Sequence, residues 1–277
     1  MTQPAIATVR KALIAKPGEP FNLRERPTRH PALFEDKKEA QVSLEKDAAT
    51  INELQDKLYA NRDRALLVIL QGMDTSGKSG VIREVFAQTS PLGLQVEAFK
   101  APSATERAHD YLWRIHKAVP RKGRIGIFDR SHYEDVLVVK VRGLAPADTV
   151  EQRYDQINAF ERHLAENGVV LVKCMLNVGY ETQGKRLHER LEEPHKRWKF
   201  NPADLEDRKL WPDFMDAYET TVTRCSTGAA PWYIVPADSR TRRNAMIARL
   251  VRGALEDMDL DWPDPGHRPG DFDVPEA

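Results

Sequence analysis

The sequence predicts a three-layer α/β fold in which a parallel sheet of five strands carries helices on both faces. Short apolar runs alternate with longer helical stretches, and residues 65–70 are apolar at every position. Strands read this way when crossover helices cover both faces of a parallel sheet. The length of 277 residues allows one large core with attached segments.

Four segments are expected along the chain. Residues 1–38 are rich in proline and charge without a sustained period, which predicts an extended arm. Residues 39–61 carry one apolar stripe, so we expect a helix packed on the main domain; a coiled-coil dimer is the alternative, although the stripe is short for a zipper. The main domain should span 62–258, with a lid at about 179–207, and 259–277 should form a flexible tail.

Within the main domain the strands are expected at five places. These are residues 65–71, 95–99, 124–128, 169–176 and 232–235. The stretches between them carry helix start signals, such as the capping box formed by Ser103 and Glu106. Alternating strands and helices of this kind are typical of βαβ units.

Composition excludes several classes of protein. Forty-two basic and forty-two acidic residues give no net charge, which argues against a general nucleic-acid coat. No apolar run is long enough to span a membrane and no signal peptide is visible, so a cytoplasmic protein is expected. The two cysteines and eight histidines show no metal-ligand spacing, and any metal should be held by carboxylates.

The strongest local signal directly follows the first predicted strand. It matches the pattern GxxxxGK(S/T), in which glycines turn backbone N–H groups toward an anion and the lysine adds a charge. A tight turn is the alternative, but strand, loop and helix occur in the order that phosphate binding requires. The expected phosphate-binding residues are Gly72, Met73, Thr75, Ser76, Gly77, Lys78 and Ser79.

Asp74 lies inside this loop, where a carboxylate would repel phosphate unless a cation lay between them. Asp129 follows another buried strand, at the edge of the sheet where α/β folds place ligands. The two acids are therefore candidate ligands of Mg²⁺, with Mn²⁺ as a substitute. Arg130 comes next and is a candidate for bracing the transferred phosphate, whereas helix capping by Ser131 is the alternative reading of this turn.

The predicted lid is basic. Arg186 and Arg190 are four residues apart and share a helix face, which would lie over the phosphates if the lid closed. Closure would also exclude water. A merely solvated basic helix is the alternative.

Together these motifs resemble the second polyphosphate kinase family. The resemblance runs from about residue 36 to 255 and is carried by segments 72–78, 128–136, 196–200, 230–233 and 236–238. It implies a P-loop kinase fold like that of thymidylate kinase, dependence on Mg²⁺, and reversible phosphoryl transfer between polyphosphate and nucleotides. A homo-oligomer, dimer or tetramer, is also implied.

Matching by motif assigns roles to individual residues. Asp74 and Asp129 would organise the metal, Lys78 and Arg130 would bind phosphate, and Arg186 and Arg190 would be the lid arginines, which makes these six the candidate catalytic residues. The candidate nucleotide-binding residues are Tyr133, Glu134, Arg130 and Lys199.

Glu134 stands where many relatives carry asparagine, and this acidic version resembles the subgroup that accepts both AMP and ADP. Ser79 departs from close relatives, which often have aspartate after the lysine. It could take the magnesium role of a P-loop hydroxyl, or the change could be neutral.

Two other functions remain open at this level. A conventional nucleoside monophosphate kinase that uses ATP would share the loop, the acids and the arginines. A nucleotide-binding or polyphosphate-binding module without turnover would need neither Asp74 nor Asp129, and the presence of both favours an enzyme.

Overall fold

A sheet of six strands forms the centre of the computed structural model, which describes residues 3–29, 33–268, 270–272 and 275. The strand order is β1-β6-β5-β2-β4-β3. The bounds are β1 Ile14–Ala15, β2 Ala65–Gln71, β3 Leu94–Ala98, β4 Ile125–Asp129, β5 Val169–Asn177 and β6 Trp232–Pro236. Strands β2 to β6 are mutually parallel and lie where the sequence predicts five strands.

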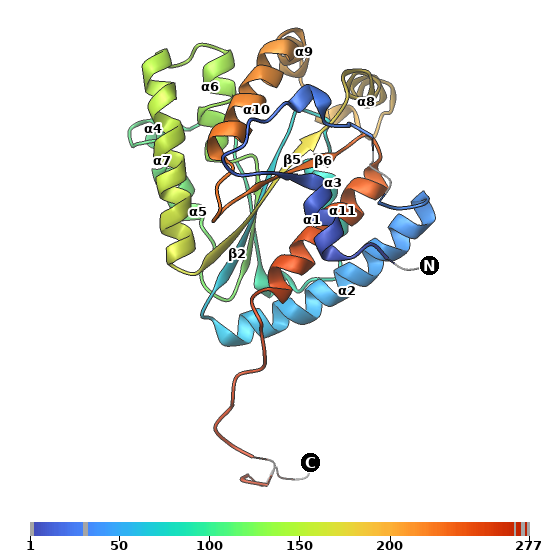
Figure 1. The fold of residues 1–277 in the computed structure, drawn as a ribbon, viewed down its shortest axis with the longest axis vertical. Helices are drawn as coiled ribbons and strands as arrows, with labels where there is room; N and C mark the ends of the chain where they lie inside the picture. Colours follow the sequence, from blue (N-terminus) through green and yellow to red (C-terminus); the bar gives the residue numbers. More distant parts are fainter. Residues whose placement is uncertain (1–2, 30–32, 269, 273–274, 276–277) are drawn as a thin grey trace.

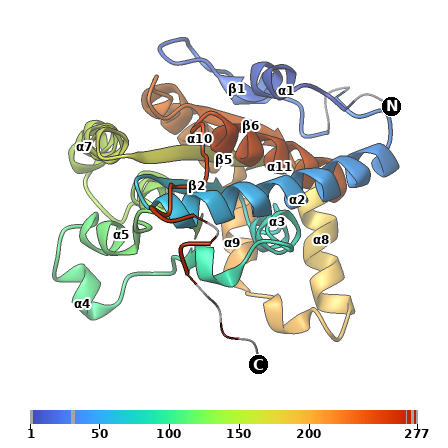
Figure 2. The same cartoon turned by 90° about the horizontal axis from the view of Figure 1, so that it is seen from below.

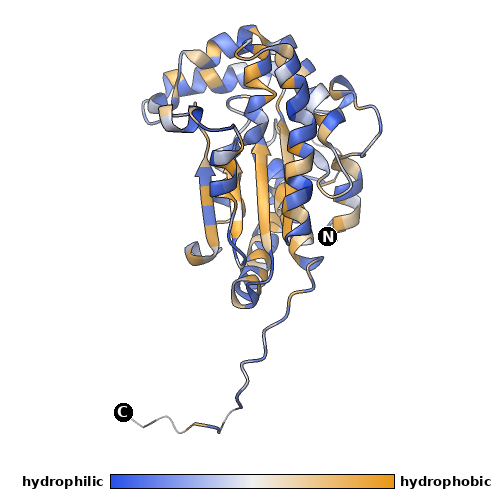
Figure 3. Cartoon of the chain, turned by 90° about the vertical axis from the view of Figure 1, so that its left-hand side faces the viewer, coloured by the Kyte–Doolittle hydropathy of each residue, from blue (hydrophilic) through white to orange (hydrophobic). Residues whose placement is uncertain are grey.

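Helices enclose this sheet, as the α/β prediction requires (Figures 1 and 2). Helices α2, α3 and α11 contact one another on one face, and α7 packs against β5 on the other. Colouring by hydropathy shows the apolar strands between more polar helices (Figure 3). The helices are α1 Ile6–Leu13, α2 Lys37–Asn61, α3 Lys78–Val85, α4 Ala104–Arg107, α5 Trp113–Ala118, α6 Val138–Val141, α7 Ala147–Glu166, α8 Tyr180–Glu192, α9 Ala203–Lys209, α10 Trp211–Cys225 and α11 Arg240–Glu256.

The N-terminal segment differs from the predicted extended arm. Helix α1 packs against α11 through buried Val9 and Leu13, which lie four residues apart on one helix face. Strand β1 then pairs antiparallel with β6, so Ile14 lies opposite Tyr233. The expected number of five strands was therefore wrong by one, and the sheet is mixed rather than wholly parallel. A helix of eight residues, about two turns, and a two-residue strand are too short to produce a clear sequence pattern.

Helix α2 covers α11 along its length, as its apolar stripe predicts. The side chain of Asp36 caps the helix by accepting a hydrogen bond from the backbone N–H of Glu39 at 2.7 Å. Ile51 and Leu58 are fully buried against the core. These contacts cover the apolar face of α2, so the helix packs on the main domain of its own chain.

The carboxyl ends of the parallel strands meet at one edge of the sheet, and the loops that follow them carry most of the predicted site residues. The lid segment (residues 179–207) contains α8 and the start of α9 and lies beyond this edge (Figure 1). Past α11, the described residues of the predicted tail form no helix or strand and extend away from the body. None of the described helices combines the length and the apolarity that a membrane span requires.

Candidate active site

The loop between β2 and α3 has the shape expected of an anion cradle. Gly72 has φ +146° and Gly77 has φ +102°, and a Cβ at Gly72 would lie 2.7 Å from the backbone oxygen of Leu176. Glycine is therefore required for both the conformation and the space. Lys78 begins α3 and folds back over the loop, where its Nζ donates to the Gly72 carbonyl at 2.8 Å.

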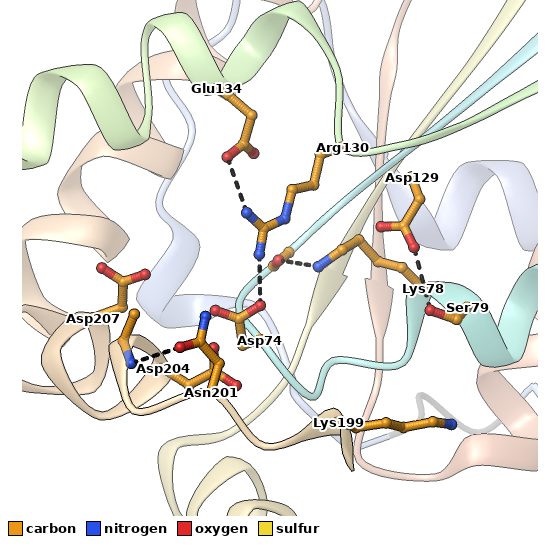
Figure 4. A network of polar contacts seen from close by, with 12 residues as sticks. Asp74, Lys78, Ser79, Asp129, Arg130, Glu134, Lys199, Asn201, Asp204 and Asp207 are labelled. Carbon is orange, nitrogen blue, oxygen red and sulfur yellow. Dashed lines mark hydrogen bonds and ion pairs between the residues drawn. The ribbon is translucent and has the colours of Figure 1, made fainter. Parts of the chain in front are cut away.

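Two adjacent strands bring the predicted acids to this loop. Residue 70 of β2 pairs with Asp129 at the end of β4, and Asp129 accepts a hydrogen bond from Ser79 Oγ at 3.3 Å. Arg130 has φ +65° and donates through Nη2 to Asp74 Oδ1 at 2.7 Å. Figure 4 shows Lys78 among these side chains. The strand register thus assembles Asp74, Lys78, Asp129 and Arg130 in one place, as the sequence predicts.

The charged side chains of the cluster shift one another's pKa values. Burial lowers the pKa of Lys78 and the neighbouring Arg130 lowers it further, against the attraction of Asp129 and Asp74. Burial alone would raise the pKa of Asp74, but the positive charges of Lys78 and Arg130 outweigh it and the pKa is lowered. Asp74 therefore remains an anion between two cations, available as an oxygen ligand.

Glu134 lies on the other side of Arg130. Its Oε2 is 3.7 Å from Arg130 Nη1, and its Oε1 accepts a hydrogen bond from Gln71 Nε2 at 3.2 Å. Burial raises the pKa of Glu134, and Arg130 only partly offsets this. The carboxyl at this position consequently adds an acceptor or a shared proton where asparagine would offer a neutral amide.

The lid segment contacts the loop directly. Arg190 Nη1 donates to Asp204 Oδ2 at 2.9 Å. Asp204 lies beside Asp74, and burial together with that neighbouring carboxylate raises the pKa of Asp204 to about 6. Sequence reasoning missed Asp204, because an acid in the first turn of a helix is normally explained by the helix dipole.

Arg186 lines the cavity, but its guanidinium is hydrogen-bonded to backbone carbonyls. Its side chain is buried, and it donates to the carbonyls of Thr75 at 3.0 Å, Ala237 at 2.8 Å and Asp238 at 3.0 Å. The guanidinium therefore joins the lid to the back of the loop. Its predicted catalytic role stays a prediction.

A cavity of about 1600 Å³ opens above the cluster. One wall holds the polar side chains already described, and another is formed by apolar side chains and arginines beyond β3, including Phe99, Tyr111, Val138 and Arg114. The predicted site residues that line the cavity are Asp74, Thr75, Gly77, Lys78, Ser79, Asp129, Arg130, Glu134, Arg186, Arg190 and Lys199.

The remaining predicted residues do not line the cavity. Gly72, Met73 and Ser76 shape the loop from behind. Tyr133 is fully buried, and its hydroxyl donates to Glu161 Oε1 at 2.7 Å. In this structure Tyr133 is thus a support of the acid loop (residues 129–135) and has no free surface for a nucleotide.

The oxygen donors at the cluster fit a magnesium ion. Across the described ranges of the chain, no group of three or more His, Cys, Asp or Glu side chains is placed to hold a metal. Magnesium, however, keeps several waters and typically binds through one or two carboxylates together with substrate phosphates. Asp74 and Asp129 are the two carboxylates available here, and the Ser79 hydroxyl, which contacts Asp129, is a third oxygen donor.

A family model for polyphosphate kinase 2 (PPK2) matches residues 34–263. The chain belongs to this family. The match covers the phosphate loop, the acid loop and the lid segment. The enzyme class, a transferase of phosphoryl groups, follows from the family.

Relatives support the assignment at high identity. The chain is 46% identical over 215 residues to the AMP/ADP-polyphosphate phosphotransferase of Meiothermus ruber, covering 78% of this chain and 80% of the relative. It is 39% identical over 259 residues to the ADP-polyphosphate phosphotransferase of Rhodopseudomonas palustris, covering 89% and 90%. A crystal structure of polyphosphate kinase 2 from Arthrobacter aurescens TC1 superposes with TM-score 0.90 at 41% identity, over 99% of this chain and 95% of that one.

Proposed function

We propose that this polyphosphate kinase 2 transfers phosphoryl groups reversibly from inorganic polyphosphate to AMP and to ADP, giving ADP and ATP. The observation that carries the proposal is Asp74 inside the phosphate loop, where it pairs with Arg130 and where the charges of both Asp74 and Asp129 act on Lys78. Glu134 at the edge of the cavity and the name of the Meiothermus relative support the use of both acceptors.

The chain's own residues account for binding and orientation. The N–H groups at the start of α3 and the Lys78 amine bind the reacting phosphates. Arg130 contacts Asp74 and Glu134 and would brace the phosphoryl group as a P–O bond of the donor breaks and one to the acceptor phosphate forms. The lid segment, whose Arg190 lines the cavity, would exclude water when it closes over the site.

A magnesium ion held by Asp74 and Asp129 would neutralise the phosphate oxygens between donor and acceptor. Ser79 keeps the Asp129 carboxylate turned toward the loop. Arg130 orients the Asp74 carboxylate in the same way, through a hydrogen bond to its Oδ1. The chain therefore orients both metal ligands through neighbours that are themselves in the site.

The decisive experiment mixes the purified protein with Mg²⁺, long-chain polyphosphate and AMP, without any nucleoside triphosphate, and follows ADP and ATP by chromatography. Both products are expected. ADP alone would reject the second acceptor step, and transfer that occurs only when ATP is supplied would favour a conventional nucleoside monophosphate kinase.

Variants test the site itself. Asp74→Asn and Asp129→Asn should each lower kcat by at least about a hundredfold, because each removes a ligand of the charge-neutralising ion. The matched control is Asp155→Asn on α7, whose exposed carboxylate lies near Arg224 and outside the cavity. Full activity in either site variant would reject the metal-centred mechanism.

A further inference from the structure

An arginine that no motif indicates packs against the phosphate loop and reaches the lining of the cavity. Arg243, in the first turn of α11, is 2% exposed. Its Nη1 donates to the Ser76 carbonyl at 2.7 Å, while Nε and Nη2 donate to Asn244 Oδ1 at 3.1 and 2.8 Å. A Cβ at Gly77 would lie 2.0 Å from Nη1, so the guanidinium touches the loop backbone itself.

Within the described part of the chain Arg243 forms no ion pair, and only the more distant charge of Glu84 partly offsets its own. No carboxylate there lies within 4.0 Å, and its hydrogen-bond partners are neutral oxygens. Burial lowers its pKa to about 9, and the repulsion of Arg186 and Arg240 adds to this. Arg243 is therefore still a cation at neutral pH, and a buried cation without a partner is expensive to keep.

Arg186 repeats the arrangement from the lid side. It donates to the Thr75 carbonyl and, among the residues described, forms no ion pair with a carboxylate. Two guanidinium groups thus hold successive carbonyls of the loop. The Arg186 guanidinium adds a second positive charge at the loop, which strengthens the case that a bound anion compensates these charges.

The orientation of one peptide unit follows from the Arg243 contact. The Ser76 carbonyl and the Gly77 N–H belong to the same planar trans peptide and point in opposite directions. Because Arg243 holds that carbonyl, it also fixes the direction of the Gly77 N–H, and Gly77 lines the cavity. Ser76 N–H donates to Met73 O at 3.1 Å, whereas the Gly77 N–H has no backbone acceptor among the described residues.

We propose that Arg243 is a positioning residue of the phosphate loop, which fixes the Ser76–Gly77 peptide for anion binding and places a buried positive charge beside the bound phosphate chain. This inference rests on the proposed function only for the identity of the anion. An anion in the loop would be the counterion that Arg243 lacks, so binding would relieve part of the cost of burying the cation.

Two substitutions separate charge from hydrogen bonding. Arg243→Lys keeps the charge and a donor, whereas Arg243→Gln keeps a donor and removes the charge. The matched control is Arg252→Gln on the same helix, where the lost arginine pairs with Asp47 and Glu256 far from the loop. The probe is inorganic tripolyphosphate, whose Kd is measured by calorimetry, together with kcat and KM for polyphosphate.

The expected result is a rise in Kd and KM on the order of tenfold for Arg243→Gln, with kcat changed much less, and values within about threefold of wild type for Arg243→Lys. Arg252→Gln should match wild type. Equal effects of the lysine and glutamine variants would overturn the role of the charge, and wild-type Kd in both would overturn the whole proposal.

A further variant keeps the test decisive if Arg243→Gln does not fold. Asn244→Ala leaves the charge in place but removes the acceptor of two of its hydrogen bonds, and should raise Kd for tripolyphosphate about threefold. An unchanged Kd would contradict the positioning role. Since calorimetry needs no turnover, failure of the proposed transfer reaction would appear separately, as absence of product in wild-type protein.

Discussion

A buried ion pair supports the acid loop, and breaking it should destabilise the fold. Lys173 in the centre of β5 donates to Glu161 Oε2, to the Tyr133 hydroxyl at 2.8 Å and to the Cys225 carbonyl at 2.7 Å. His132 contacts the other carboxylate oxygen of Glu161 at 3.2 Å. Lys173 and His132 are fully buried, so replacing Lys173 by methionine leaves the Glu161 charge without its main partner and without water.

The magnitude follows from that burial. Removing one member of a buried pair costs about 3–5 kcal/mol, a large share of the ~5–15 kcal/mol by which a domain is stable. For a chain of this size the melting temperature should fall by about 10 °C. The double variant Lys173→Met with Glu161→Gln should recover most of the loss, because no buried charge is then left unpaired.

Urea and thermal denaturation of the two single variants and the double variant complete the measurement as a double-mutant cycle. Lys209→Met is the control, since its pair with Glu206 is exposed and worth about 0–1 kcal/mol. If Lys173→Met lost less than about 1 kcal/mol, or the double variant lost the sum of the single losses, the reasoning would be refuted.

The same pair sets a pH dependence. Burial alone would raise the pKa of Glu161, but the charge of Lys173 and the hydrogen bond from His132 outweigh the effect of burial. The pKa is therefore lowered below the unfolded value of about 4.3. Stability from a lowered carboxyl pKa is present above the unfolded value and is lost as pH falls through the folded one. Wild type should therefore lose stability between pH 5 and pH 3 as Glu161 is protonated. The double variant lacks this carboxylate and should lose less over the same range, as measured by urea titration at each pH.

Three further predictions concern the loop, the arm and the lid. Gly77→Ala should abolish tripolyphosphate binding in calorimetry, because φ +102° strains any side chain and a methyl group would displace the Arg243 guanidinium, whereas Gly228→Ala, with open space around it, should bind normally. Leu13→Asp should cost about 2–5 kcal/mol in urea denaturation, since the side chain is 1% exposed between α1 and the core; a loss under 1 kcal/mol would show that the arm is dispensable. Arg190→Ala should raise KM for polyphosphate by about tenfold in steady-state kinetics with the melting temperature little changed, and an unchanged KM would remove Arg190 from the site.

The parallel strands and the acid pair could be predicted because both leave short-range signals. Strand β2 was a continuous apolar run, the other four were mostly apolar, and Asp129 was recognisable as an acid at a strand end. Since parallel strands align their carboxyl ends, placing Asp129 near Asp74 followed from topology alone. The phosphate loop was equally local, because its glycines and Lys78 lie within one motif.

What could not be predicted depends on contacts between distant segments. Arg243 lies far along the chain from Ser76 and reads in the sequence as one arginine of a basic helix. Tyr133 is adjacent to the cluster in sequence, but its direction is set by Lys173 and Glu161 on two other elements. Side-chain direction at such places is decided by packing, which the local pattern does not contain.

The pairing of β1 with β6 places a constraint on the order of folding during synthesis. Ile14 and Ala15 leave the ribosome early, but their partners Tyr233 and Trp232 are made near the end. At about 5–20 residues per second, the arm waits at least about ten seconds before its strand position exists. Until then Val9 and Leu13 have no core to join, and the exposed edge of the nascent chain invites wrong pairing. A chain arrested before β6 should consequently be a better substrate for chaperones than its length alone suggests.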